Sequence, residues 1–305
     1  MKPMNRKRLL PILGILLSAA VAAAALLPLE QASAHRSGWM KDLPDNTPLN
    51  SMTVPGTHDS GALHSFAGVA GKCQSAAIRE QLEMGVRFLD IRLKLVRNEL
   101  RVVHSFVDQK LPLADVLADL TSFIRENPSE FLLVSFKEDD PPEKSDVSFS
   151  ARLETMLAGC GDVIAPDSAL PATLGEARGK IFILSRYADA SLGIQARHSW
   201  QDSASFVMGE LYIQDHYEIS DVSDKQDDIR TAAEQAASGK YSLTLNFTSC
   251  YLDHGFPPLS AAVPARRINP WLMEFCSAAG SCPGIFVCDF MTSELAAVMI
   301  ERNFR

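Results

Sequence analysis

The chain has 305 residues, of which 47% are hydrophobic and 22% are charged. This composition is typical of a folded globular protein and excludes a largely disordered chain. The formal net charge is -8, and the chain after its first residues has no basic cluster that could hold a nucleic acid by releasing its counterions. A nucleic-acid partner is therefore not expected.

The N-terminus has the three parts of a secretory signal peptide. Lys and Arg residues among the first eight positions precede an apolar run over residues 9–29, and Ala32-Ser33-Ala34 follows as an A-x-A cleavage site. We expect residues 1–34 to be removed, a single catalytic domain over residues 35–305, and a secreted protein. An uncleaved anchor is the alternative, because the run is long enough to span a bilayer.

Short β-branched runs alternate with helical patterns along the rest of the chain. Strands are expected at residues 51–55, 86–95, 100–105, 131–138, 180–186, 210–217, 242–249 and 284–291. Helices are expected at residues 113–124, 146–160, 220–238, 266–279 and 293–302. Apolar strands separated by helices predict a parallel sheet that is covered on both faces.

Eight such strands predict an α/β fold, namely a single (β/α) barrel of the TIM type. Only a short turn at Arg97 and Asn98 separates the second and third strands, so one helix is expected to be missing there. A doubly wound open sheet is the alternative. It is disfavoured because the chain has no GxGxxG after a strand and no GxxxxGK[ST].

All six cysteines follow the expected cleavage site, so in an exported protein they could pair. Cys276 and Cys282 are close in sequence and form the expected local disulfide, with buried free thiols as the alternative. No CxxC or HExxH pattern is present, and the sequence spacing therefore predicts no zinc site.

Polar side chains recur where the apolar strands end. They are His58, Asp59, Asp90, Arg92, His104, Lys137, Arg186, Asp215, Tyr217, Asn246 and Asp289. In a parallel barrel these positions converge on the C-terminal rim, which carries the active site. Histidines with carboxylates and cations around one pocket indicate acid–base chemistry on an anionic substrate.

Several stretches resemble the bacterial phosphatidylinositol-specific phospholipases C, which are secreted relatives of the catalytic X region of eukaryotic phospholipases C. They are WMKDLPDNTPLNSMTVPGTHDSG (39–61), GVRFLDIRLKL (85–95), VVHSF (102–106), NPSEFLLVSFKED (127–139), GKIFILSRY (179–187), YIQDHY (212–217), LNFTS (245–249) and FVCDF (286–290). They occur in the family's order over nearly the whole chain. The resemblance implies cleavage of phosphatidylinositol into diacylglycerol and inositol 1,2-cyclic phosphate.

The resemblance also implies the catalytic roles. His58 would be the general base, supported by Asp289, and His104 would be the general acid, assisted by Asp59. Arg92 would hold a phosphate oxygen. A base and an acid on opposite sides of the phosphorus are needed because neither alkoxide forms freely near neutral pH.

The resemblance implies further contacts for the inositol ring. Lys137, Arg186 and Asp215 would bind its hydroxyls, and Tyr217 would form a flat wall beside it, while Asp90 would fix the phosphate-binding arginine. That arginine takes the place of a calcium ligand of the eukaryotic relatives. Because its charge would repel a divalent cation, we expect no metal and no cofactor.

The expected partner is phosphatidylinositol at a membrane surface, which a monomer would meet transiently. Phe66 and Phe256 are expected to dip into the interface, with burial in the core as the alternative. A lipid-binding protein that has lost catalysis and a metal-dependent glycerophosphodiesterase are the competing functions. The first would lack a catalytic residue, and the second would need a carboxylate-rich metal site.

Overall fold

The computed structural model describes residues 36–65, 71–253, 260–278, 280 and 282–305. The expected signal peptide, Phe66 and Phe256 lie outside these residues, so their assignments stay predictions. Within the described part of the chain, no helix is both long and apolar enough to cross a membrane.

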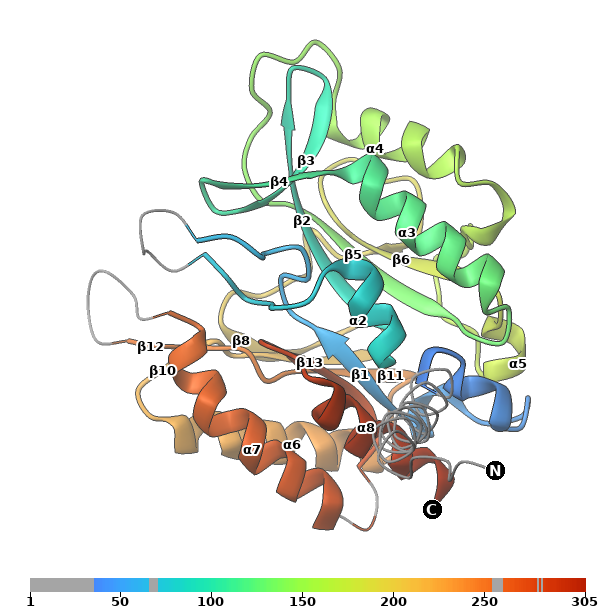
Figure 1. Cartoon of the computed structure of the whole chain (residues 1–305), viewed down its shortest axis with the longest axis vertical. Helices are drawn as coiled ribbons and strands as arrows, with labels where there is room; N and C mark the ends of the chain where they lie inside the picture. The colour runs from blue at the N-terminus through green and yellow to red at the C-terminus, as the bar shows by residue number, and fades with distance from the viewer. Residues whose placement is uncertain (1–35, 66–70, 254–259, 279, 281) are drawn as a thin grey trace, which may run out of the picture.

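A curled 11-stranded sheet forms the centre of the molecule (Figure 1). Its main path runs in the order β7-β6-β5-β2-β1-β13-β11-β9-β8. The strands in this path are β1 (Thr53–Thr57), β2 (Phe88–Val96), β5 (Leu132–Glu138), β6 (Ile181–Arg186), β7 (Ile194–Gln195), β8 (Ala204–Met208), β9 (Leu211–Asp215), β11 (Leu243–Phe247) and β13 (Gly284–Cys288). All neighbours are parallel except β8 and β9. The predicted barrel class is confirmed in an irregular form.

The third predicted strand is the exception, because it is not part of the barrel wall. It forms β3 (Glu99–His104), which pairs antiparallel with β2 and with β4 (Val107–Pro112), while β2 pairs directly with β5. Arg97 and Asn98 have φ angles of 51° and 64°, so they form the two-residue turn that reverses the chain. The connection lacks a helix, as predicted, and the hairpin projects above the sheet (Figure 1).

Helices cover the outside of the sheet (Figure 1). They are α2 (Ile78–Met84), α3 (Leu113–Glu126), α4 (Phe149–Ala158), α5 (Leu174–Ala177), α6 (Val222–Ala237), α7 (Ala262–Ala278) and α8 (Ser293–Glu301). Short 3-10 turns lie at Trp39–Asp42, Leu49–Ser51, Gly161–Val163 and Arg302–Phe304, and β10 (Glu218–Ile219) pairs with β12 (Tyr251–Leu252). The five predicted helices are present. The prediction missed α2 and α5, which are too short to show a clear period.

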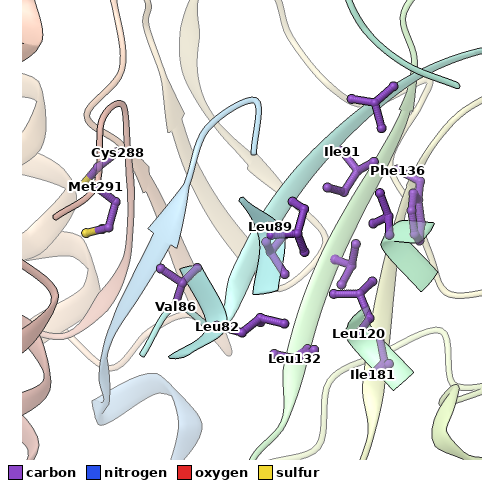
Figure 2. Packing of buried hydrophobic residues seen from close by; sticks show 14 of the residues in the cluster. Leu82, Val86, Leu89, Ile91, Leu120, Leu132, Phe136, Ile181, Cys288 and Met291 are labelled. Atoms are coloured by element: carbon purple, nitrogen blue, oxygen red, sulfur yellow. The ribbon is translucent and has the colours of Figure 1, made fainter. Parts of the chain in front are cut away.

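Alternation along the strands separates the core from the site. On β2, Leu89 and Ile91 pack outward against α3, with Phe136 and Leu132 of β5 beside them (Figure 2). Phe88, on the opposite face, belongs to a second buried cluster inside the barrel. Because side chains alternate between faces, later residues on the Phe88 face also point inward near the carboxyl end of β2. Asp90 and Arg92 are those residues.

A buried ion pair at the base of the sheet gives a test of the fold. Arg87 and Glu130 are both fully buried, and Arg87 Nη2 lies 2.7 Å from Glu130 Oε2. Glu130→Ala leaves this guanidinium buried without its carboxylate. We therefore expect the free energy of unfolding, measured with denaturant, to fall by about 3–5 kcal/mol. The control is Glu126→Ala, which removes the exposed partner of Arg79 and is expected to change little. Equal effects of the two substitutions would contradict this account.

Candidate active site

The polar residues at the strand ends surround one cavity of about 480 Å³. Of the ten residues predicted for the site, those that line the cavity are His58, Arg92, His104, Lys137, Arg186, Asp215, Tyr217 and Asp289. Asp59 and Asp90 are fully buried beneath it. Asn246, which the rim pattern also includes, is buried in β11 and donates to the Ile229 carbonyl, 3.0 Å away. It does not belong to the cavity wall.

His58 and Asp289 form the first pair of the site. The pair arises from strand register, because Thr57 of β1 lies beside Cys288 of β13 and the next residue of each strand enters the cavity. His58 Nδ1 donates to Asp289 Oδ1 over 2.8 Å. Arg92 Nη2 donates to His58 Nε2 over 2.7 Å, so this nitrogen carries a lone pair.

Opposing effects set the proton affinity of His58. Burial and the Arg92 charge lower its pKa, whereas the charge and hydrogen bond of Asp289, together with Asp59, raise it. The raising effects are larger, and the pKa of His58 lies above its ordinary value. The carboxylates therefore favour protonation of this imidazole.

Asp59 and His104 form the second pair. Asp59 has a left-handed φ of 45°, which turns the chain directly after His58 and directs the two adjacent side chains to different partners. Asp59 Oδ2 lies 3.3 Å from His104 Nε2, which reaches the cavity from the end of β3. Burial raises the pKa of Asp59, although Arg92 and His104 oppose the effect. The prediction placed His104 at the end of a barrel strand, whereas the structure places it at the end of β3 in the hairpin.

Arg92 lies between the two pairs and forms ion pairs with two buried carboxylates. Its Nε is 3.3 Å from Asp90 Oδ2 and 3.5 Å from Asp59 Oδ2. Burial alone would lower the pKa of Arg92, but these carboxylates raise it well above its usual range. Burial in turn would raise the pKa of Asp90, yet Arg92 and Arg186 hold it well below its usual range. The guanidinium is therefore charged, fixed and directed toward the cavity.

The far wall of the cavity combines hydrogen-bonding groups with a flat ring. Arg186 stacks on Trp200 with 3.7 Å from its guanidinium carbon to the ring centroid, and Trp200 Nε1 donates to Asp215 Oδ2 over 2.9 Å. Lys137 Nζ donates to Asp139 Oδ1 over 2.7 Å. Donors, acceptors and an aromatic face together suit a polyhydroxylated ring.

Tyr217 also lines the cavity. Its hydroxyl donates to Asp202 Oδ1 over 2.5 Å, and its ring packs against Tyr251 with centroids 5.7 Å apart. The sequence interpretation missed Trp200 and Asp139. Asp139 could have been found, because it lies two residues after Lys137. Trp200 lies in a loop that carries no periodic signal.

The expected disulfide is not formed. All six cysteines are buried free thiols, and the Sγ atoms of Cys276 and Cys282 lie 3.8 Å apart. This is too far for a sulfur–sulfur bond, which measures about 2.05 Å. The two residues do lie close together, as their sequence spacing indicated, but they are free thiols, which was the alternative.

Comparisons with known proteins support the resemblance found in the sequence. Residues 46–187 match the family model described as phosphatidylinositol-specific phospholipase C, X domain. The 1-phosphatidylinositol phosphodiesterase of Listeria monocytogenes is 27% identical over 276 residues, which cover 87% of this chain and 84% of the relative. The enzyme of that name from Staphylococcus aureus strain Newman is 27% identical over 266 residues, 79% of this chain and 84% of the relative.

Solved structures agree with this similarity. A double mutant of the S. aureus phosphatidylinositol-specific phospholipase C matches with a TM-score of 0.75 and 25% identity, over 88% of this chain and 98% of the other. The L. monocytogenes phosphatidylinositol-specific phospholipase C matches with a TM-score of 0.71 and 25% identity, over the same shares. The resemblance found in the sequence is confirmed: residues 46–187 match the phosphatidylinositol-specific phospholipase C X domain, and the similar proteins are bacterial enzymes of that kind.

Proposed function

We propose that this protein is a secreted phosphatidylinositol-specific phospholipase C. It cleaves phosphatidylinositol at a membrane surface into diacylglycerol and inositol 1,2-cyclic phosphate, without a metal ion. The observation that carries the proposal is the pair of His–Asp couples on either side of the Arg92 guanidinium. The activity named for the Listeria and Staphylococcus relatives supports it, and the signal-peptide pattern supports secretion.

The first half of the reaction uses His58. Its Nε2 takes the proton of the inositol 2-hydroxyl, and the hydroxyl oxygen then forms a bond to phosphorus. The hydroxyl must replace Arg92 Nη2 at this nitrogen, which frees the guanidinium to bind a phosphate oxygen as charge develops there. Asp289 stabilises the imidazolium that results.

The second half uses His104. In its protonated form it gives a proton to the glycerol oxygen as the bond from this oxygen to phosphorus breaks, and diacylglycerol leaves. Asp59 stabilises the protonated form through the 3.3 Å contact. Lys137, Arg186 and Asp215 bind the ring hydroxyls.

Metal independence follows in this proposal from the position of Arg92. Its Nε lies 3.5 Å from Asp59 Oδ2 and 3.3 Å from Asp90 Oδ2, so a positive charge already stands beside the carboxylates that a calcium ion would need. Turnover of phosphatidylinositol in excess EDTA separates this proposal from a metal-dependent glycerophosphodiesterase. We expect full activity with chelator present. Loss of activity that calcium or magnesium restores would overturn metal independence, and no cleavage in either condition would favour a lipid-binding protein.

Replacing Asp289 by Asn is expected to shift the pH dependence of the reaction. The charge of Asp289 no longer raises the pKa of His58, while burial and the Arg92 charge still lower it, so this pKa falls. The base must be neutral to act, and activity is lost as the pH falls through this pKa. The acidic limb of the kcat/KM profile should therefore move to lower pH, with a lower plateau. A limb that moves to higher pH would contradict the assignment of His58 as the base.

An exposed aromatic residue marks the face that meets the membrane. Phe106 is 74% exposed and follows His104 by two residues in the β3–β4 hairpin. Inserting a phenylalanine into the interface contributes about 1.5–3 kcal/mol, so Phe106→Ser should weaken vesicle binding on the order of 10-fold. Turnover of soluble inositol 1,2-cyclic phosphate should stay unchanged.

The control is Phe304→Ser. Phe304 is 43% exposed and follows Asn303, whose side chain bonds to Thr53 at the amino end of β1, opposite the cavity. We expect normal vesicle binding from this variant. Equal weakening by both substitutions would contradict the proposed orientation on the membrane.

A further inference from the structure

Cys73 lies between the two His–Asp couples, and the proposed reaction gives it no role. It is 2% exposed and belongs to the cavity wall. Its backbone is held on both sides, because its N–H donates to the Ala62 carbonyl and its carbonyl accepts from the Phe290 N–H. The backbone that carries the thiol is therefore fixed in place.

Two sets of metal-ligating atoms include this thiol. His58, Cys73 and Asp289 offer ligand atoms within 4.8 Å of one another, and so do Asp59, Cys73 and His104. In the first set the nitrogen and oxygen are 2.8 Å apart in a hydrogen bond. Ligands on a tetrahedral zinc ion lie about 3.3–3.5 Å apart, given bonds of about 2.0–2.2 Å, so this pair is too close.

The second set has ligand atoms at the spacing that a zinc ion requires, and it includes a buried carboxylate oxygen without a partner. His104 Nε2 and Asp59 Oδ2 are 3.3 Å apart, which matches an edge of such a tetrahedron. Asp59 is fully buried, and its Oδ2 has only the contacts to Arg92 Nε (3.5 Å) and His104 Nε2 (3.3 Å), while its Oδ1 has no hydrogen-bond partner among the described residues. Buried carboxylate oxygens nearly always have such partners. His104 and Cys73 line the cavity, which gives an ion a path of entry.

We propose that Asp59, Cys73 and His104 bind a zinc ion, with the fourth position open to the cavity. On binding, the thiol releases its proton to solvent and the sulfur joins zinc as a thiolate. The thiolate and the carboxylate together balance the two charges of the zinc ion. Calcium prefers oxygen ligands, so it would not bind the thiolate, and the carboxylate alone would not balance its charge beside Arg92. Zinc at this place occupies His104, the general acid of the proposed reaction, so it inhibits the enzyme; this consequence alone rests on the proposed function.

Calorimetric titration of the resting protein with zinc chloride tests the site without any substrate. We expect one zinc ion per chain, and with cobalt(II) an absorption band from the sulfur–cobalt bond. Because loss of outer-shell partners already costs about 10–100-fold in affinity, Cys73→Ser should weaken binding on the order of 100-fold and remove the band. The matched control is Cys250→Ser, since Cys250 lines the same cavity but belongs to neither ligand set.

A second pair of variants identifies the ligand set even if Cys73→Ser does not fold. His104→Gln should lose zinc binding, whereas His58→Gln should keep it. Unchanged binding in Cys73→Ser, or loss in His58→Gln with retention in His104→Gln, would overturn the proposal, as would the absence of zinc binding by the parent. Failure of phosphatidylinositol cleavage is a separate result, because these titrations contain no substrate.

Discussion

Replacing either His58 or His104 by Ala is expected to abolish nearly all cleavage of phosphatidylinositol. Each substitution removes one partner of a coupled proton transfer, an effect on the order of 10²–10⁴-fold in rate. The fold should survive, because both side chains line the cavity and are 16% and 23% exposed. Rates measured beside a thermal unfolding curve of each variant check both expectations.

A substrate with an acidic leaving group separates the two histidines. Such a group departs without a proton, so His104→Ala should recover much of its rate while His58→Ala should not. His216→Ala is the control, since His216 pairs with Asp228 at 2.8 Å and does not line the cavity. Equal responses of the two catalytic variants to the leaving group would contradict their assignment as base and acid.

Arg92→Lys is expected to lower kcat on the order of 10²–10³-fold with little change in KM, as for the loss of one donor to a developing oxyanion. In the parent, Nε rests on Asp90 and Asp59 while Nη2 reaches His58, a fork that one ammonium group cannot reproduce. The contact strengthens only as charge develops on the phosphoryl group, which is why kcat carries the effect.

The control for this substitution is Arg101→Lys. Arg101 lies on β3 and is 42% exposed, with ion pairs to Glu99 and Asp108 at the surface. We expect normal kinetics from it. A raised KM with unchanged kcat in Arg92→Lys would mean that the guanidinium binds substrate and transition state equally, contrary to its proposed role.

The sequence was sufficient to predict the parts of the site that strand geometry dictates. Asp90 and Arg92 are two residues apart on β2, and Lys137 lies near the end of β5. Parallel strands then bring these ends together at one rim. The family resemblance paired His58 with Asp289, and the parallel register of β1 and β13 explains why residues 231 positions apart meet.

Other features depend on turns and loops, where no period guides a prediction. The place of His104 follows from two left-handed residues at Arg97 and Asn98, which make its strand part of a hairpin. Trp200 reaches Arg186 from an irregular loop. Cys73 meets its two carboxylate neighbours only after folding, so no local spacing could reveal the ligand set.

The short strands of the sheet could not be predicted from the sequence either. β7 has two residues, and β8 pairs antiparallel with β9 through a turn at Gly209, where φ is 58°. A two-residue strand carries too few side chains to show alternation. The class of the fold could thus be predicted from its longer strands, whereas its irregular edge could not.

The most direct test of the central proposal is phosphorus NMR of the products formed from phosphatidylinositol with EDTA present. Attack by the 2-hydroxyl with His58 as base and His104 as acid predicts the signal of a five-membered cyclic phosphate as the first product. An acyclic inositol phosphate that appears first, without the cyclic signal, would mean direct attack by water and would contradict the mechanism. No product until a metal is added would contradict metal independence.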